Sequence, residues 1–591
     1  MRNGNHIQLK AGETNVTLLS GDGRIRMLVV VIFCIGIILA VRLYFLQVIQ
    51  YDKWVAIAEN QHNTSQELTA DRGEIYMRDG DGRYPLVVNR EYQMLYVVPR
   101  DVNEKDHLAL ELSQMLGIDA LTIKEKLDKP NDPFEIIKKR LTDDEIDRVT
   151  ASSLTGVGLF PEEYRYYPAG ELASQVIGFA SLGEYGGAGG YGIEASFNSR
   201  LRGETGTVSQ EKDAVGRWIP LADRTIVSPQ NGDSLVLTLD RNIQYETEKI
   251  LREAMESYDA DGAQAIVMDP STGAILAMAA QPQFDPNNYS AIEDYTLFLN
   301  PAVSFAYEPG SIMKPITMAI GIEEGKISAQ TEYVDTGSVE KSGFTIRNSE
   351  DKVYGRSTMT KVLEESINTG VIFVEKLVGN RVFKEYIERF GFGTKTAISL
   401  PAELSGNTRN LKNERSDIAF FTASFGQGIS VTPLQMVVAY AALANGGIIY
   451  KPQIVESIIH ADGSEENIAP QEVRRVVKEE TSRSISTMLE SVVINGHGKR
   501  AHVPGYRVGG KTGTAQVAKN NAKGYEENLS IGSFVGYAPI DNPRFVVLVK
   551  IDNPKTVEWA ESSAAPTFGR MMKFLLEYAK IPPTEESVVK K

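Results

Sequence analysis

Apolar and polar positions from about residue 230 onward predict a sheet built from both ends of one long segment. Residues 233–239 alternate as a strand, and short apolar runs next to turn residues predict further strands at residues 265–268 and 274–280 and a second set at residues 533–537 and 544–551. Helical spacing predicts helices at residues 243–258 and 568–578. Because the sequence between the two sets is mostly helical, residues 230–585 are predicted to form one α/β or α+β domain.

The preceding stretch, residues 50–225, carries shorter patterns. Residues 92–98 alternate as a strand, and residues 106–116 have the spacing of an amphipathic helix. We expect an elongated α+β module here, and the pattern contains no candidate catalytic cluster.

Near the N-terminus the pattern becomes continuously apolar. Residues 27–41 carry no charge, and residues 43–49 continue mostly apolar after Arg42. A run of roughly 20 residues is long enough to span a bilayer. Basic residues outnumber acidic ones in residues 1–26, which favours an N-terminus inside the cell.

These features predict a cytoplasmic tail at residues 1–26, a single transmembrane helix at residues 27–48 and an extracytoplasmic remainder. A cleaved signal peptide is the alternative, but the run is long and no A-x-A-like site follows it directly.

Composition and charge exclude several function classes. The chain has 591 residues, too many for one core, and its 42% hydrophobic and 24% charged residues are typical of folded proteins. A net charge of -15 argues against nucleic-acid binding. The one cysteine, Cys34, lies in the apolar run, and the six histidines lack metal-ligand spacing. These patterns exclude cysteine chemistry and zinc clusters, and we interpret each histidine as a surface or packing residue.

A candidate nucleophile comes from the pattern Ser-x-x-Lys, which places a hydroxyl and an amine on one helix face. The pattern begins at Ser311, Ser338, Ser349 and Ser587. Only Ser311 follows a Glu-Pro-Gly turn and precedes apolar helical sequence, so Ser311 and Lys314 are predicted at the start of a buried helix. Backbone N–H groups there favour developing negative charge. The other three matches are interpreted as solvated chain.

Lys314 can act as a base only if its pKa falls well below about 10.4, which requires burial or a neighbouring cation. The tetrad Lys511-Thr512-Gly513-Thr514, on a predicted strand, supplies such a cation. Gly513 would let a substrate backbone approach closely, and Thr512 and Thr514 can hydrogen-bond a carboxylate.

A third motif, Ser366-Ile367-Asn368, follows the helical pattern at residues 359–365. The Ser366 hydroxyl is suited to proton relay, and the Asn368 amide is suited to orienting a substrate amide. The triplet alone is not specific, because residues 196–198 match it as well. The order of the three motifs is what carries information.

In this order the motifs resemble those of penicillin-binding proteins and class A β-lactamases. Ile367 stands where that signature has Asp, a change that is common among penicillin-binding proteins and disfavours the β-lactamase branch. Further stretches resemble motifs of class B penicillin-binding proteins, at residues 71–80, 165–170, 192–198, 426–435 and 441–447. Three other stretches are more similar to the division or sporulation type of these proteins than to the elongation type. They are residues 308–311, 533–539 and 564–583.

The resemblance implies a penicillin-binding transpeptidase fold, an antiparallel sheet with flanking helices and a helical subdomain. Residues 50–225 would be its pedestal, of the penicillin-binding protein dimerisation type. The implied activity is that of a serine-type D,D-transpeptidase, which acylates Ser311 with a D-Ala-D-Ala stem peptide and transfers it to an acceptor amine. β-Lactams would be covalent inhibitors. A SEDS-type glycan polymerase would contact the transmembrane helix and pedestal, or the pedestal would be a passive stalk that only spaces the active site from the membrane.

By the same resemblance, Lys314 would deprotonate Ser311, and Ser366 and Lys511 would pass the proton to the departing D-Ala. Backbone N–H groups of Ser311 and Thr514 would form the oxyanion hole. No metal or organic cofactor would be needed.

Three other activities are compatible with the motifs. A D,D-carboxypeptidase differs only in using water as the acceptor. A β-lactamase needs a deacylating carboxylate that the sequence does not place. A β-lactam sensor or structural relative would bind without turnover.

Overall fold

The computed structural model describes residues 21–51, 53–54, 63–129, 132–181, 188–211, 224–518 and 524–584. The chain forms two compact units. The first comprises Met1–Leu68 and Thr205–Pro229, and the second comprises Thr69–Glu204 and Gln230–Lys591.

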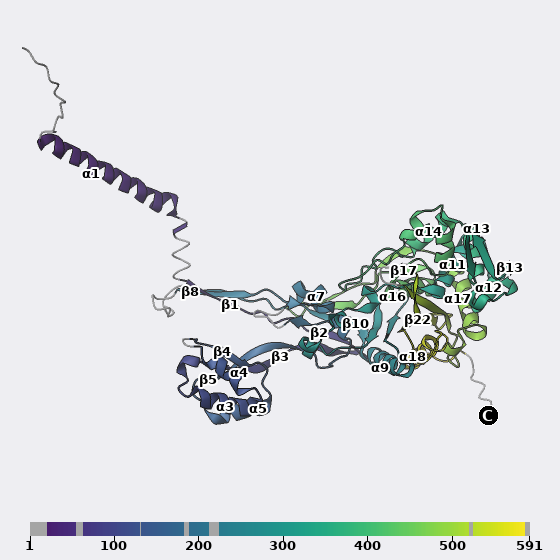
Figure 1. Ribbon diagram of the computed structural model, residues 1–591, viewed down its shortest axis with the longest axis horizontal. Coiled ribbons are helices and arrows are strands. Elements are labelled where there is room, and N and C mark those ends of the chain that lie inside the picture. The colour runs from purple at the N-terminus through teal and green to yellow at the C-terminus, as the bar shows by residue number, and fades with distance from the viewer. Residues whose placement is uncertain are drawn as a thin grey trace, which may run out of the picture. The chain divides into compact units, whose positions relative to one another are not determined.

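The first unit contains helix α1 (Gly21–Tyr44), which a π-helical turn (Phe45–Ile49) continues (Figure 1). Gly23–Ile49 is long and apolar enough to cross a membrane, and its side chains are not buried in the protein. This agrees with the predicted anchor at residues 27–48, while residues 1–20 lie outside the described part of the chain. The unit also contains an antiparallel sheet in the order β1-β8-β9 (Asn63–Leu68, Gly206–Glu211 and Arg224–Val227).

In the second unit, a seven-stranded sheet joins sequence from the predicted pedestal to sequence from the predicted catalytic domain. Its order is β19-β18-β10-β2-β3-β4, with β5 also paired to β3. The strands are β2 (Ile75–Asp79), β3 (Gly82–Val97), β4 (Glu135–Lys138), β5 (Val157–Tyr166), β10 (Ser234–Asp240), β18 (Val455–Ile459) and β19 (Glu465–Asn467). Strand β10 pairs in parallel with β2, opposing Leu235 to Ile75. The two stretches therefore share backbone hydrogen bonds.

Helices α3 (Lys105–Leu116), α4 (Ala120–Leu127) and α5 (Asp143–Ser152) pack on β3, β4 and β5 around a small apolar core of their own. A capping box between Thr142 and Glu145 starts α5. The strand predicted at residues 92–98 and the helix predicted at residues 106–116 are both confirmed.

A buried ion cluster joins three of the sequence motifs that resemble class B enzymes. Glu194 Oε2 accepts from Arg72 Nε at 2.8 Å, and Glu194 Oε1 accepts from Arg165 Nε at 2.7 Å. Asn198 and Asn89 accept from the same two guanidinium groups. Glu194 is completely buried, so its negative charge is matched by two cations and not by water.

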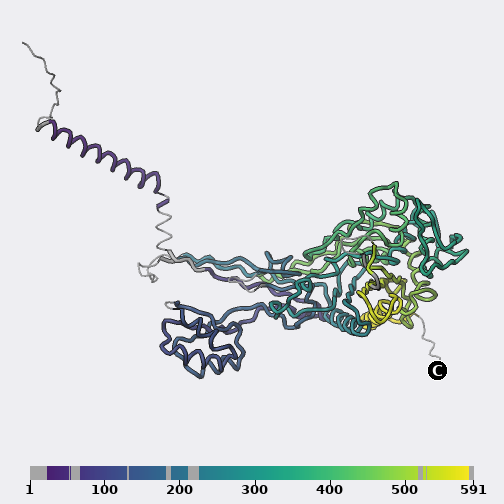
Figure 2. Tube along the Cα trace, viewed as in Figure 1, coloured from purple at the N-terminus to yellow at the C-terminus, as the bar shows by residue number. Residues whose placement is uncertain are grey.

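The catalytic part is built on a five-stranded sheet in the order β12-β11-β23-β22-β21, with every neighbouring pair antiparallel. The strands are β11 (Gly262–Met268), β12 (Ile275–Gln281), β21 (Gly509–Ala518), β22 (Tyr525–Ala538) and β23 (Phe545–Asp552). Segments far apart in sequence thus lie side by side, and Figure 2 shows the teal and yellow parts of the trace meeting there.

Alternation along these strands buries both sheet faces. Residues such as Ala265, Val549 and Phe534 pack against α9 (Arg241–Tyr258) and α18 (Ala564–Tyr578). The opposite face, with Ile266 and Leu548, packs against the helical region that contains α16 (Pro433–Ala444). An antiparallel sheet with flanking helices and a helical subdomain confirms the predicted fold class, and the strands and helices predicted from periodicity are all present.

Candidate active site

Ser311 lies in a tight 3-10 turn (Gly310–Met313) that leads directly into α11 (Lys314–Glu323). Gly310 has a φ of +56°, and its N–H donates to the Gly426 carbonyl at 3.1 Å. The buried Tyr440 hydroxyl donates to the Ile312 carbonyl at 2.8 Å. These two contacts hold the turn from both sides, so the position of Ser311 is set by groups distant in sequence.

Lys314, three residues later, is completely buried. Its Nζ donates to the Ser366 carbonyl oxygen and, at 3.1 Å, to Ser366 Oγ. Burial, together with the nearby charge of Lys511, holds the pKa of Lys314 well below its ordinary value. The neutral amine is the form of Lys314 that can accept a proton.

Ser366 sits between α12 (Met359–Glu364) and α13 (Asn368–Val378) with a φ of +55°. This left-handed conformation is uncommon for a residue other than glycine. It presents both the carbonyl and the hydroxyl of Ser366 to Lys314. The side-chain amide of Asn368 has a different partner, because its Nδ2 donates to the Arg347 carbonyl at 3.0 Å.

Lys511 lies on β21 and is also completely buried. Its Nζ donates to the carbonyl and hydroxyl oxygens of Thr512, at 3.0 and 3.1 Å. Burial lowers the pKa of Lys511 to about 7, against the opposing influence of Glu561. Both lysines of the motifs thus have lowered pKa values, and burial is the main cause in each case.

Gly513 brings β21 against the turn that carries Ser311. A Cβ there would lie 2.8 Å from Ser533 Oγ, 2.9 Å from the Ile312 side chain and 3.0 Å from the Pro309 carbonyl. The structure therefore adds a packing reason for this glycine to the substrate approach predicted from the sequence.

The motifs meet at a cavity of about 180 Å³. Ser311, Ser366, Thr512 and Thr514 line it, while Lys314 and Lys511 are buried. The other lining residues are Ser349, Glu350, Lys352, Tyr354, Glu365, His497, Trp559 and Glu561.

Sequence reasoning missed most of these other lining residues. His497 was interpreted as a surface or packing residue, but its ring lies between Glu561 Oε2 at 3.0 Å and Glu365 Oε2 at 3.8 Å. Ser349 and Lys352 are exposed, as expected for solvated chain, and they also border the site. No spacing rule signals such residues, because they reach the cavity from four separate segments.

We expect Lys511 to make stability depend on pH. The pKa of Lys511 is about 7 in the folded protein and about 10.4 in an unfolded chain. Between these values the unfolded chain binds one more proton, so the free energy of unfolding rises with pH, by up to about 1.4 kcal/mol per unit. Urea unfolding of wild type and Lys511→Met at pH 7.5, 8.5 and 9.5 should give a shallower slope in the variant.

Lys326→Met, which changes an exposed lysine, should retain the wild-type slope. Equal slopes in all three proteins would contradict a lowered pKa at Lys511.

Comparison with known proteins places this site in a family. Residues 263–573 match the model of the penicillin-binding protein transpeptidase domain, and residues 67–237 match that of the penicillin-binding protein dimerisation domain. The chain belongs to the penicillin-binding proteins. The first match contains Ser311, Lys314, Ser366, Asn368 and the Lys511-Thr512-Gly513-Thr514 tetrad.

Among penicillin-binding proteins, the chain is 34% identical to stage V sporulation protein D of Bacillus subtilis, over 98% of this chain and 88% of the relative. It is 31% identical to penicillin-binding protein PbpB of Mycobacterium tuberculosis, over 93% of this chain and 84% of the relative. A crystal structure of penicillin-binding protein 3 from M. tuberculosis, complexed with aztreonam, superposes with a TM-score of 0.68. That comparison has 27% identity and covers 88% of this chain and 99% of the other. The name of the first relative, a sporulation protein, agrees with the predicted division or sporulation type.

Proposed function

We propose that this protein is a peptidoglycan D,D-transpeptidase with Ser311 as its nucleophile. The observation that carries the proposal is the buried amine of Lys314, which donates to Ser366, while Ser366 and Ser311 both line the active-site cavity. A lysine whose pKa is lowered by burial is a competent base near neutral pH.

In the first step, Ser311 Oγ attacks the carbonyl carbon of the penultimate D-Ala and its proton passes to Lys314. The C–N bond to the terminal D-Ala breaks, and a proton reaches the leaving amine through Ser366 and Lys511. The backbone N–H groups of Ser311 and Thr514 stabilise the oxyanion, each contributing about 3 kcal/mol.

Thr512 and Thr514 bind the terminal carboxylate, and both border the cavity. Asn368 orients the donor chain through its side-chain oxygen, since its Nδ2 is occupied by Arg347.

In the second step, an acceptor amine attacks the Ser311 ester, the new amide forms, and the serine hydroxyl is regenerated. A β-lactam follows the first step only, because ring opening leaves no free leaving group and the acyl-enzyme persists.

The test is a product assay with the full chain in detergent. The protein receives a stem peptide ending in D-Ala-D-Ala and an amine acceptor, and mass spectrometry follows release of D-Ala and formation of the new amide. Ser311→Ala is the matched blank. We expect one amide product per D-Ala released in the wild type and neither in the variant.

Other results would identify the alternatives. Release of D-Ala without amide formation would indicate a carboxypeptidase, and rapid nitrocefin hydrolysis would indicate a β-lactamase. A stable penicillin adduct without any peptide turnover would indicate a sensor.

The membrane arrangement forms part of the proposal. Helix α1 anchors the protein with its N-terminus inside, so that the transpeptidase domain acts outside the membrane, where peptidoglycan lies. A SEDS-type glycan polymerase contacts the anchor and the pedestal. The exposed apolar surface of α1 and the excess of basic residues before it support this arrangement. Proteolysis of intact spheroplasts should remove the transpeptidase domain and spare an epitope placed at the N-terminus.

A further inference from the structure

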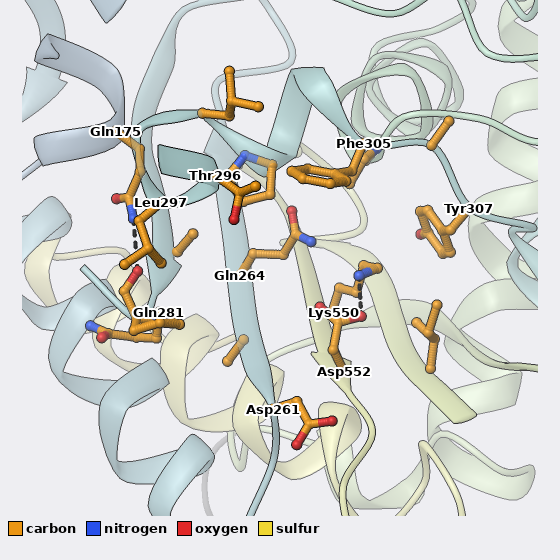
Figure 3. A pocket seen from close by; sticks show the side chains of 18 residues that line it. Gln175, Asp261, Gln264, Gln281, Thr296, Leu297, Phe305, Tyr307, Lys550 and Asp552 are labelled. Atoms are coloured by element: carbon orange, nitrogen blue, oxygen red, sulfur yellow. Dashed lines mark hydrogen bonds and ion pairs between the residues drawn. The ribbon is translucent and has the colours of Figure 1, made fainter. Parts of the chain in front are cut away.

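A second, larger cavity lies over the opposite half of the five-stranded sheet. Its volume is about 400 Å³, within the range of small-molecule sites. Figure 3 shows it from close by. Side chains from β11, β12, β22 and β23 form its floor, and the segment from Thr296 to Tyr307 contributes a wall. None of its lining residues belongs to the three catalytic motifs.

The floor carries a row of polar residues across the sheet. Gln264 on β11 pairs in register with Lys550 on β23, Lys550 pairs with Ser533 on β22, and Ser533 pairs with Gly513 on β21. Gln264 and Lys550 are 3% and 6% exposed. The neighbouring row on this face, through Ile266 and Leu548, is apolar and packs in the core. Burying the polar side chains of Gln264 and Lys550 costs free energy, and apolar side chains could fill the same positions in the sheet without that cost.

One buried polar atom at this cavity has no partner. Gln264 Oε1 makes no hydrogen bond to any described residue. The Tyr307 hydroxyl, in contrast, interacts with the Ser533 side chain. Such atoms are rare in folded proteins, because each loses its hydration without compensation. Figure 3 shows the Gln264 amide and the Lys550 ammonium turned toward the same space, beside the ring of Phe305.

The charges of the lining residues restrict what can bind. Lys550 is paired with Asp552, and its ammonium lies 5.3 Å from the centre of the Tyr307 ring. Asp261, the other charged lining residue, is paired with Lys555 at 2.9 Å. The lining thus holds one cation, Lys550, and two carboxylates, Asp552 and Asp261. An anionic ligand would therefore gain little electrostatic attraction. Gln264 Oε1 is a hydrogen-bond acceptor that lacks a donor. The side chains of Leu297, Leu299 and Phe305 make the surrounding cavity wall apolar.

We propose that this cavity binds a small neutral amide with an apolar substituent, such as one blocked amino-acid residue. An N–H of the ligand donates to Gln264 Oε1, and a carbonyl oxygen accepts from Gln264 Nε2 or Lys550 Nζ. A residue of extended peptide carries these two groups side by side, and a side-chain carboxamide matches both. The apolar substituent packs on Phe305 and the two leucines.

The test measures binding to the full-length Ser311→Ala variant in detergent, so that it does not depend on the proposed acyl transfer. The probe is N-acetyl-leucine methylamide, followed by saturation-transfer NMR and by the shift in unfolding temperature. Two analogues serve as ligand controls. One has both amide nitrogens methylated, and the other, N-acetyl-leucine, carries a carboxylate. We expect each to bind about 10-fold more weakly than the probe.

Gln264→Met and Gln244→Met form a matched pair of variants. Both glutamines are buried, but Gln244 is fully bonded, donating to Glu248 and the Met278 carbonyl and accepting from the Met278 N–H. Gln264→Met should raise the unfolding temperature of the unliganded protein and remove the preference for the N–H ligand. Gln244→Met should lower the unfolding temperature and leave that preference unchanged.

Three results would overturn the proposal: no binding of the probe, equal binding of the N-methylated analogue, or full binding by Gln264→Met. The stability change in Gln264→Met shows that this variant is folded, so loss of binding there cannot be attributed to unfolding. Failure of the product assay for peptide transfer would leave these results untouched.

Discussion

Lys314→Met is expected to slow acylation of Ser311 by a β-lactam about 10²- to 10⁴-fold, the range associated with loss of a general base. Lys314 is completely buried, and burial together with Lys511 lowers its pKa, so it is poised as the neutral base. Methionine has an unbranched side chain of similar shape to that of lysine, and burying it does not remove a charge from water. The variant loses the donor to Ser366 and gains apolar burial, so its free energy of unfolding should change by no more than about 2 kcal/mol.

The measurement is the second-order rate of labelling by fluorescent penicillin, beside an unfolding curve for each protein. Lys326→Met is the control, because Lys326 is exposed near the end of the same helix. It should label at the wild-type rate. If Lys314→Met also labelled at that rate while folded, another group would have to deprotonate Ser311.

Glu194→Gln is expected to lower the free energy of unfolding by about 3 to 5 kcal/mol, because it leaves two buried arginines without their counter-ion. Burial raises the pKa of Glu194, but Arg165 and Arg72 more than offset this effect, so the pKa is lowered. A carboxylate with a lowered pKa stabilises the fold above its ordinary pKa near 4.3, and this stabilisation is lost as pH falls through the folded value. The loss caused by the substitution should therefore be fully visible at pH 7.

Glu456→Gln is the matched control for this change. Glu456 also binds one arginine through both oxygens, but its side chain is 34% exposed and that of Arg78 is 40% exposed. Water screens such a pair, and its loss should cost no more than about 1 kcal/mol. Urea unfolding at pH 7 compares the two variants. Similar small losses in both would show that the Arg72–Glu194–Arg165 cluster contributes little to stability.

The positions of several strands and helices followed from the sequence alone. Short apolar runs next to turn residues located the strands at residues 265–268 and 544–551, and helical spacing located the helix at residues 243–258. These signals are local, because each reports which side chains of one element share a face. The three catalytic motifs and their order were also visible in the sequence. The Glu-Pro-Gly turn and the apolar helical pattern around it identified Ser311 among four Ser-x-x-Lys matches.

Tertiary structure alone decided how those motifs act together. The pKa of Lys314 depends on burial and on Lys511, which lies almost two hundred residues further along the chain. Gly513 is required because Ser533 and Ile312 leave no room for a side chain there. Arg72 and Arg165 are brought together by their shared partner Glu194. His497 and Glu561 reach the active-site cavity from segments without any recognisable spacing. Periodicity and motifs describe neighbours along the chain, whereas burial, charge pairing and cavity walls depend on which distant segments the fold brings together.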